Sequence, residues 1–281
     1  MIRGPLLAAL VLAATLTGCT GRDVSAPAQA AAAPAGSPRH PARIDGHPNL
    51  NGVWQAVNTA NWNLEGGAAK AIPSAWKLGA LFAVPAGASV VDGGTIPYLP
   101  AALEQRKKNQ ADWPASDPET KCNRAGVPRS TYLPYPFQIV QGDGDIMFIY
   151  AYATSNRPVR MKNHLNPDEV LVEQWSGWSN GRWDGDSLVV DVFGQISDTW
   201  FDRAGNFHGQ GMKVTERYTP IDADHLQYEA TIDDPSTFER PWKISMPLYR
   251  RVEPNAEIYE YKCVEFAEPL LYGELLKDPI K

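Results

Sequence analysis

Apolar and polar residues alternate along much of the chain with the period of two that β-strands show. From residue 212 to 219, apolar side chains and Glu216 share one face, and Lys, Thr and Arg side chains share the other. After a turn rich in Pro and Asp, the alternation resumes over residues 226–233. The pattern predicts an antiparallel hairpin with one buried face and one solvent-facing face.

The same alternation predicts further strands between turn signals. Gly and Asp residues at 142–145 are typical of a tight turn, and the pair Asp184-Gly185 supplies the positive φ that a type I′ hairpin turn requires. We expect eight to ten strands in all, including those at residues 137–141, 146–152, 187–193, 242–249 and 258–265.

Helical signal is strongest at residues 100–109, where Pro100 begins a run of good helix formers. Gly and Pro otherwise break residues 61–117 into loops. Many antiparallel strands must close or stack to protect their edges. We therefore expect a mainly β fold, an antiparallel barrel or a sandwich, and favour the barrel.

The string Gly52-Val53-Trp54 resembles the Gly-x-Trp opening of lipocalin-like barrels. In those barrels the Trp packs across the closed end against an Arg from a late strand. Arg250 or Arg251 could supply that Arg here. A core Trp on the first strand of any other β fold would give the same string.

The first residues have the anatomy of an export signal, because Arg3 precedes an apolar stretch that is too short to span a bilayer as a mature helix. The string Leu16-Thr17-Gly18-Cys19 resembles the bacterial lipobox. This resemblance implies cleavage before Cys19 and attachment of diacylglycerol to its thiol. In such lipoproteins an Asp directly after the Cys is associated with retention in the inner membrane, and this chain has Thr20 there. The resemblance therefore implies anchoring in the outer membrane, facing the periplasm. An ordinary signal peptide with a chance Cys is the alternative.

The chain then divides into three parts. We expect a signal peptide at residues 1–18, a lipidated and disordered tether at 19–44, and a single β-rich domain at 45–281. The net charge is −6, and the loss of Arg3 with the signal leaves about −7. Nucleic acid and anionic lipid are therefore poor partners, and the membrane is reached through the N-terminal lipid only.

Cysteine use fits an oxidising compartment. With Cys19 taken by lipid, two cysteines remain, Cys122 and Cys263, and we expect them to form a disulfide. Such a bond would close a loop of about 140 residues and stabilise the fold by about 4–5 kcal/mol through the entropy of the unfolded chain. Two buried free thiols are the alternative.

The densest group of polar and aromatic residues lies in a loop at 198–208. His208 can titrate near neutral pH, Asp198 or Asp202 could orient it, Arg203 could hold an anionic group, and Trp200 offers an aromatic wall. The alternative is a packed loop in which Asp202 and Arg203 pair with each other and His208 caps a turn.

Glu216 is unusual because it shares the apolar face of its strand with Tyr218. A carboxylate on such a face is costly unless it is paired. It could serve as a general acid or base or bind a ligand hydroxyl. A structural ion pair with an inward Arg, such as Arg250, is the alternative.

Other catalytic patterns are weak. The string 177–181 matches Gly-x-Ser-x-Gly around Ser179, but a nucleophile elbow needs a following helix, and a hairpin turn follows here. The five His residues are scattered, so we predict no metal, although a site assembled from distant residues such as His164, His208 and Glu216 stays open. No dinucleotide or P-loop glycine pattern is present, and we predict no cofactor.

Several strings together resemble a large group of secreted bacterial proteins, common in proteobacteria and acidobacteria. They are Gly-Arg-Trp-Asp-Gly-Asp-Ser-Leu-Val-Val at 181–190, Thr-Trp-Phe-Asp-Arg-Ala-Gly-Asn-Phe-His at 199–208, Thr-Glu-Arg-Tyr at 215–218, Thr-Ile-Asp-Asp-Pro at 231–235 and Arg-Pro-Trp at 240–242. The resemblance implies that Asp202, Arg203, His208 and Glu216 belong to the group's signature stretch. Gly209 departs from it, since the group often has Ser there.

Two functions follow as hypotheses. The first is a binding protein whose barrel-like domain encloses a small apolar, aromatic or glycosylated molecule, with Trp200, Arg203, Asp198 and Tyr218 as ligand-binding residues. The second is an enzyme without an organic cofactor, a lyase, isomerase or hydrolase, in which His208 acts with Asp202 and Glu216. A structural or partner-binding lipoprotein ranks third.

Overall fold

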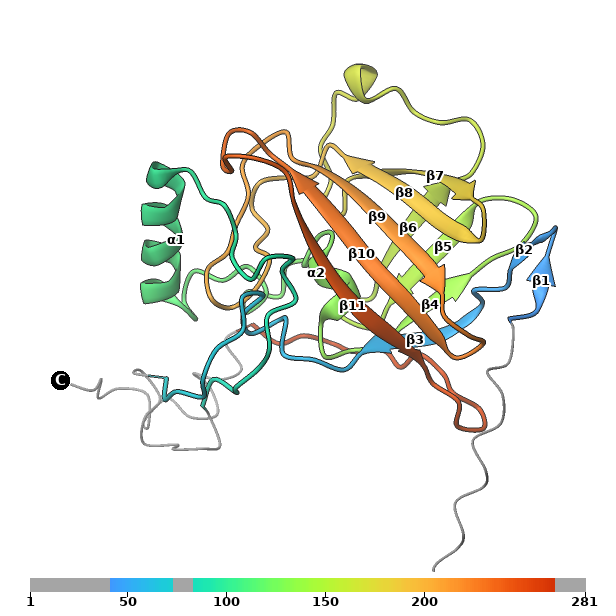
Figure 1. Cartoon of the computed structure of the whole chain (residues 1–281), viewed down its shortest axis with the longest axis horizontal. Coiled ribbons are helices and arrows are strands. Elements are labelled where there is room, and N and C mark those ends of the chain that lie inside the picture. The colour runs from blue at the N-terminus through green and yellow to red at the C-terminus, as the bar shows by residue number, and fades with distance from the viewer. Residues whose placement is uncertain (1–40, 73–82, 266–281) are drawn as a thin grey trace, which may run out of the picture. The chain divides into compact units, whose positions relative to one another are not determined.

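Within residues 41–72 and 83–265, which the computed structural model describes, nine strands close into a barrel (Figure 1). Their order around the barrel is β10-β11-β3-β4-β5-β6-β7-β8-β9. The strands are β3 (Gly52–Ala56), β4 (Phe137–Val140), β5 (Ile146–Tyr150), β6 (Ser155–Arg160), β7 (Trp178–Asp184), β8 (Ser187–Phe193), β9 (Lys213–Pro220), β10 (His225–Asp233) and β11 (Trp242–Arg250). The predicted mainly β, barrel-like fold is confirmed.

The predicted signal peptide, Cys19 and the tether as far as residue 40 lie outside the described residues. A two-stranded pair, β1 (Arg43–Ile44) with β2 (His47–Pro48), begins just before residue 45, where we placed the start of the domain. Among the helices that the structure describes, none is long and apolar enough to cross a membrane.

The period-two alternation correctly predicts the hairpin of β9 and β10. Tyr218 pairs with Tyr228, and Glu216 pairs with Ala230, so the buried residues of both strands share the inner face of the barrel. The turn between β7 and β8 contains Gly185 at φ +59°, as the Asp-Gly pair predicts.

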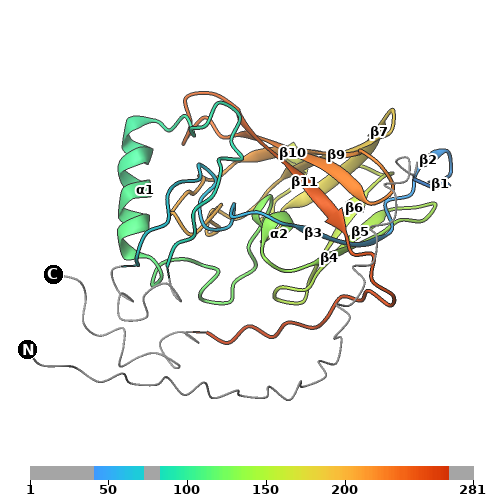
Figure 2. The ribbon, with the colours of Figure 1, turned by 60° about the horizontal axis from the view of Figure 1, so that its bottom comes forward.

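The helix α1 (Pro100–Asp112) extends three residues beyond the predicted 100–109. Figures 1 and 2 place it at the end of the barrel opposite β1 and β2. Two short helices, α2 (Arg129–Tyr132) and the 3₁₀ helix η2 (Pro167–Glu169), carry no clear signal in the sequence.

The predicted strand at 258–265 is wrong. Only Tyr261 forms a bridge there, with Tyr152. Both edges of β11 are already paired, with β10 and β3, so the closed barrel offers this segment no free edge. The predicted disulfide instead holds it, because Cys263 is bonded to Cys122 across 141 positions of sequence.

The contact between Trp and a late-strand Arg that the Gly-x-Trp string suggests is present. The Arg250 guanidinium lies 4.2 Å from the ring centroid of Trp54, and Trp54 Nε1 donates a hydrogen bond to the Leu50 carbonyl. Gly52 has φ +140°, and a side chain there would overlap the Arg250 guanidinium. Arg250, rather than Arg251, therefore covers the Trp.

Candidate functional site

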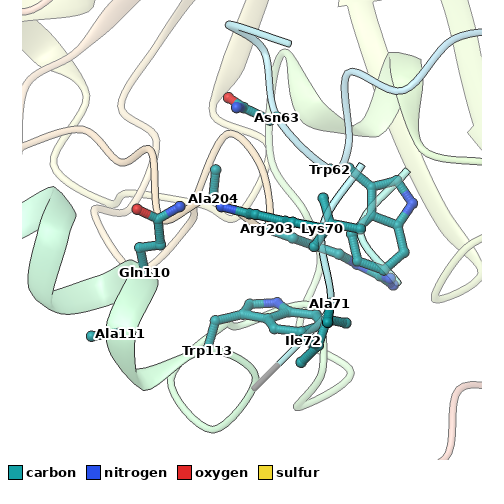
Figure 3. Close-up of a pocket in the computed structure, with 11 residues that line it drawn as sticks. Trp62, Asn63, Lys70, Ala71, Ile72, Gln110, Ala111, Trp113, Arg203 and Ala204 are labelled. Carbon is teal, nitrogen blue, oxygen red and sulfur yellow. The ribbon is translucent and has the colours of Figure 1, made fainter. Parts of the chain in front are cut away.

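A cavity of about 490 Å³ lies outside the barrel, between α1 and two loops (Figure 3). One loop leads from β3 to α1, and the other, residues 194–212, joins β8 to β9. The walls combine two indole rings, aliphatic side chains and a few polar groups, contributed by Trp62, Asn63, Lys70, Ala71, Ile72, Val84, Gln110, Ala111, Trp113, Arg203 and Ala204.

Two Trp rings and an Arg gather on one side of this cavity. The Arg203 guanidinium lies 4.5 Å from the Trp62 ring centroid and 5.9 Å from that of Trp113. The two indole rings are 5.8 Å apart and tilted by 58°. Figure 3 shows Gln110 of α1 across the cavity from Trp62. Planar side chains and a guanidinium in this arrangement suit a ligand with a flat or apolar face.

A buried chain of alternating charges fixes Arg203. Its Nε and Nη2 donate to the two carboxylate oxygens of Glu119 at 2.9 and 3.0 Å. Glu119 also accepts from Arg129, which donates to both oxygens of Asp117 at 2.8 and 3.0 Å. Burial alone would raise the pKa of Glu119, but Arg203 and Arg129 outweigh it and lower that pKa.

The same network positions both indole rings. Trp113 Nε1 donates to Asp117 at 3.2 Å. Arg129 Nε donates to the side chain of Asn61, which precedes Trp62 in the chain. The backbone carbonyl of Asn61 accepts from the Arg203 amide at 2.9 Å. The walls of the cavity are therefore held before any ligand arrives.

The Asp202 carboxylate links the two loops of the cavity by hydrogen bonds. Its carboxylate accepts from the backbone amides of Leu64, Ala204 and Asn206 and from the Asn206 side chain. Burial raises the pKa of Asp202 to about 6, although these N–H donors act against the rise. Asp202 thus fixes the loop that carries Arg203, and it does not pair with Arg203.

The helix α1 packs directly on the second loop. Asn109 donates to the Gly205 carbonyl at 3.3 Å, and Arg106 donates to the Asn206 side chain at 3.2 Å. Gly205 has φ +82°, and a side chain there would overlap the α1 backbone at Arg106 and Gln110. This glycine therefore permits the close approach that brings Gln110 to the cavity.

His208 is buried and does not line the cavity. Its Nδ1 lies 2.9 Å from the Gly209 carbonyl, and its Nε2 lies 2.7 Å from the Thr199 hydroxyl. A carbonyl only accepts, so Nδ1 carries the proton and Nε2 accepts from Thr199. Burial lowers the pKa of His208.

We expect His208 to titrate below pH 6.5 and, when neutral, to carry its proton on Nδ1. Because its folded pKa is lowered, the unfolded chain takes up the proton first as the pH falls, and the stability that His208 contributes is lost below about pH 6.5. Two-dimensional ¹H–¹⁵N NMR of the imidazole nitrogens measures both the tautomer and the pKa. Titration of His208 at or above pH 6.5 would contradict this assignment.

Glu216 lies inside the barrel, fully buried, with three partners. Arg157 Nη2 donates to it at 2.7 Å, and the hydroxyls of Tyr218 and Tyr228 donate at 2.9 and 2.8 Å. The inward ion pair that we considered is therefore present, but its cation is Arg157 on β6 rather than Arg250.

The three predicted catalytic residues, His208, Asp202 and Glu216, thus have separate sets of hydrogen-bond partners. Among the described hydrogen bonds, none joins His208 to Asp202 or Glu216. Of the predicted ligand-binding residues, Arg203 lines the cavity. The others do not: Trp200 is buried and bridged to Phe207, Tyr218 lies in the barrel, and Asp198 is exposed.

Two further sequence patterns have a clear place in the structure. Ser179 lies within β7 with its side chain buried, and β8 rather than a helix follows, so the Gly-x-Ser-x-Gly string is no nucleophile elbow. In the described part of the chain, no three His, Cys, Asp or Glu side chains lie close enough to hold a metal ion.

Sequence reasoning missed most of the cavity. Trp62, Lys70, Gln110 and Trp113 all fall in the region that we read as loops and one surface helix. The available signal was the presence of Trp62 and Trp113 near the two ends of this Gly- and Pro-rich region.

No protein-family model and no curated protein sequence matches this chain.

Proposed function

We propose that the protein binds a small molecule with an aromatic, apolar or glycosylated face in the cavity beside α1. The observation that carries the proposal is the arrangement of Trp62, Trp113 and Arg203, which a buried ion network holds in place around an open cavity. The cavity volume falls within the usual range of about 300–1,000 Å³ for small-molecule sites.

This site differs from the barrel interior, where we first expected the ligand. Large side chains fill the interior, among them Phe137, Phe148, Arg157, Tyr218 and Tyr228, all fully buried. In this proposal the barrel is the rigid support, and the loops at its end form the binding site. The expected lipid anchor at Cys19 would keep that site near the outer membrane.

The acid–base hypothesis receives no comparable support. His208 does not line the cavity, and Glu216 is fully occupied by Arg157 and two tyrosine hydroxyls. Binding therefore stands as the proposed function.

Replacing Trp113 with Ala is expected to weaken binding by about tenfold or more, because an indole face and its contact area are lost. Isothermal titration calorimetry with phenol, indole, naphthamide and phenyl glucoside measures the effect, starting from whichever of these probes binds the native chain. Trp178→Ala is the matched control, since Trp178 lies on β7 and does not line the cavity. The proposal fails if none of the probes binds, or if Trp113→Ala binds as tightly as the native chain.

A further inference from the structure

Among the residues that the structure describes, two cations and no carboxylate line the cavity. Lys70 and Arg203 contribute to its walls, and no Asp or Glu does so among the described residues. The whole chain is acidic, with a net charge of −6. A local surplus of positive charge in such a chain therefore points to the charge of the ligand.

The two cations differ in how far they are neutralised. Arg203, Glu119, Arg129 and Asp117 form a set of two cations and two anions. That set has no net charge, so Lys70 supplies the net positive charge of the cavity.

Lys70 is exposed, and no other described residue pairs with its ammonium group. Its backbone is fixed, because its amide and carbonyl both bond to Val84, at 3.1 and 2.8 Å. Two carboxylates close in sequence to residues of the cavity wall have partners of their own: Glu65 pairs with Arg106, and Asp112 accepts from Ser116. The Lys70 backbone is thus held at the cavity wall, and the charge of its ammonium group is available to a ligand.

Arg203 can add a second donor to the same ligand group. Glu119 occupies the edge formed by Nε and Nη2, whereas Nη1 has no hydrogen-bond partner among the described residues. A guanidinium that keeps one terminal nitrogen free can donate to an anionic oxygen without losing its structural pair.

We propose that the ligand is an aromatic carboxylate, whose ring packs against Trp113 and the aliphatic wall while its carboxylate meets Lys70 and Arg203 Nη1. The aliphatic wall consists of Ile72, Val84 and the neighbouring alanines. This assignment rests on the proposed function, since it names the class of molecule that the same cavity takes. An apolar wall with an uncompensated cation at its margin selects for an amphipathic anion over a neutral compound of equal shape.

The test compares naphthoate with naphthamide, which have the same ring system and differ in charge. The native chain is expected to bind naphthoate about tenfold or more tightly than naphthamide by isothermal titration calorimetry. Lys70→Gln should remove most of this preference and leave naphthamide binding unchanged, whereas Trp113→Ala should weaken both compounds. Lys108→Gln is the matched control, because it removes the same charge from an exposed position of α1 that does not line the cavity.

The outcomes separate this inference from the proposed function. Equal affinity of the native chain for the two compounds would overturn the carboxylate assignment and leave small-molecule binding intact. A full preference for naphthoate in Lys70→Gln would overturn the role of Lys70. If neither these two compounds nor the neutral probes bind, both proposals fall.

Discussion

Replacing Arg157 with Leu is expected to lower the free energy of unfolding by about 3–5 kcal/mol. Arg157 and Glu216 are 1% and 0% exposed, and their nearest atoms are 2.7 Å apart. Removing the cation leaves the Glu216 carboxylate buried in the barrel with only the two tyrosine hydroxyls as donors. Equilibrium denaturation in urea, followed by circular dichroism, measures the loss.

Two further variants define the cause of this loss. The double variant Arg157→Met with Glu216→Leu is expected to be more stable than Arg157→Leu alone, because no unpaired charge remains in the barrel. Arg182→Leu breaks an exposed pair with Asp191 and should cost less than about 1 kcal/mol. An Arg157→Leu chain as stable as Arg182→Leu would show that the buried pair does not support the barrel.

Replacing Arg129 with Met is expected to lower the free energy of unfolding by a similar amount, about 3–5 kcal/mol, and also to abolish binding in the cavity. Arg129 donates to Asp117, Glu119 and Asn61, and both carboxylates are nearly fully buried. Without it, Asp117 loses its ion-pair partner in this set, and Glu119 keeps only Arg203. Urea denaturation and calorimetry with naphthoate measure the two effects.

The conservative change Arg129→Lys should recover only part of the stability, because an ammonium group cannot reproduce the bidentate contact with Asp117 and reach Asn61 at once. Arg217→Met is the control, since it breaks the partly exposed pair with Asp184 and should cost less than about 1 kcal/mol. Native stability together with native affinity in Arg129→Met would refute the role of the network.

The effects of Arg157→Leu and Arg129→Met distinguish the stability of the barrel from binding in the cavity. Arg157 lies on β6 inside the barrel and makes no contact with the charged network around Arg203 among the described ion pairs. We therefore expect the Arg157→Leu chain to bind naphthoate with native affinity under conditions in which it is folded. Arg129→Met should lose this affinity even at low temperature and without denaturant.

The barrel was predictable because the sequence features that determine its strands and turns are local. Strict alternation along β9 and β10 fixes which side chains face inward, and Asp184-Gly185 fixes a turn. The segment at 258–265 shows the limit of such reasoning. Its residues alternate, but pairing also requires a free edge, and closure of the barrel leaves none.

The cavity was not predictable in the same way, because its parts meet only through the tertiary fold. Glu119 and Arg203 are 84 positions apart, and Asn61 and Arg129 are 68 apart. Adjacency misled as well, since Asp202 binds backbone amides on one side of the loop while its neighbour Arg203 binds Glu119. No local sequence pattern shows which partner Asp202 or Arg203 takes.

A crystal structure of the protein grown with naphthoate tests the assignment of the binding site most directly. We predict the naphthyl ring against Trp113, beside Trp62, with its carboxylate within hydrogen-bond distance of Lys70 Nζ and Arg203 Nη1. A ligand bound inside the barrel or on another face, with the Trp62–Arg203–Trp113 cavity empty, would contradict the assignment of this cavity as the binding site.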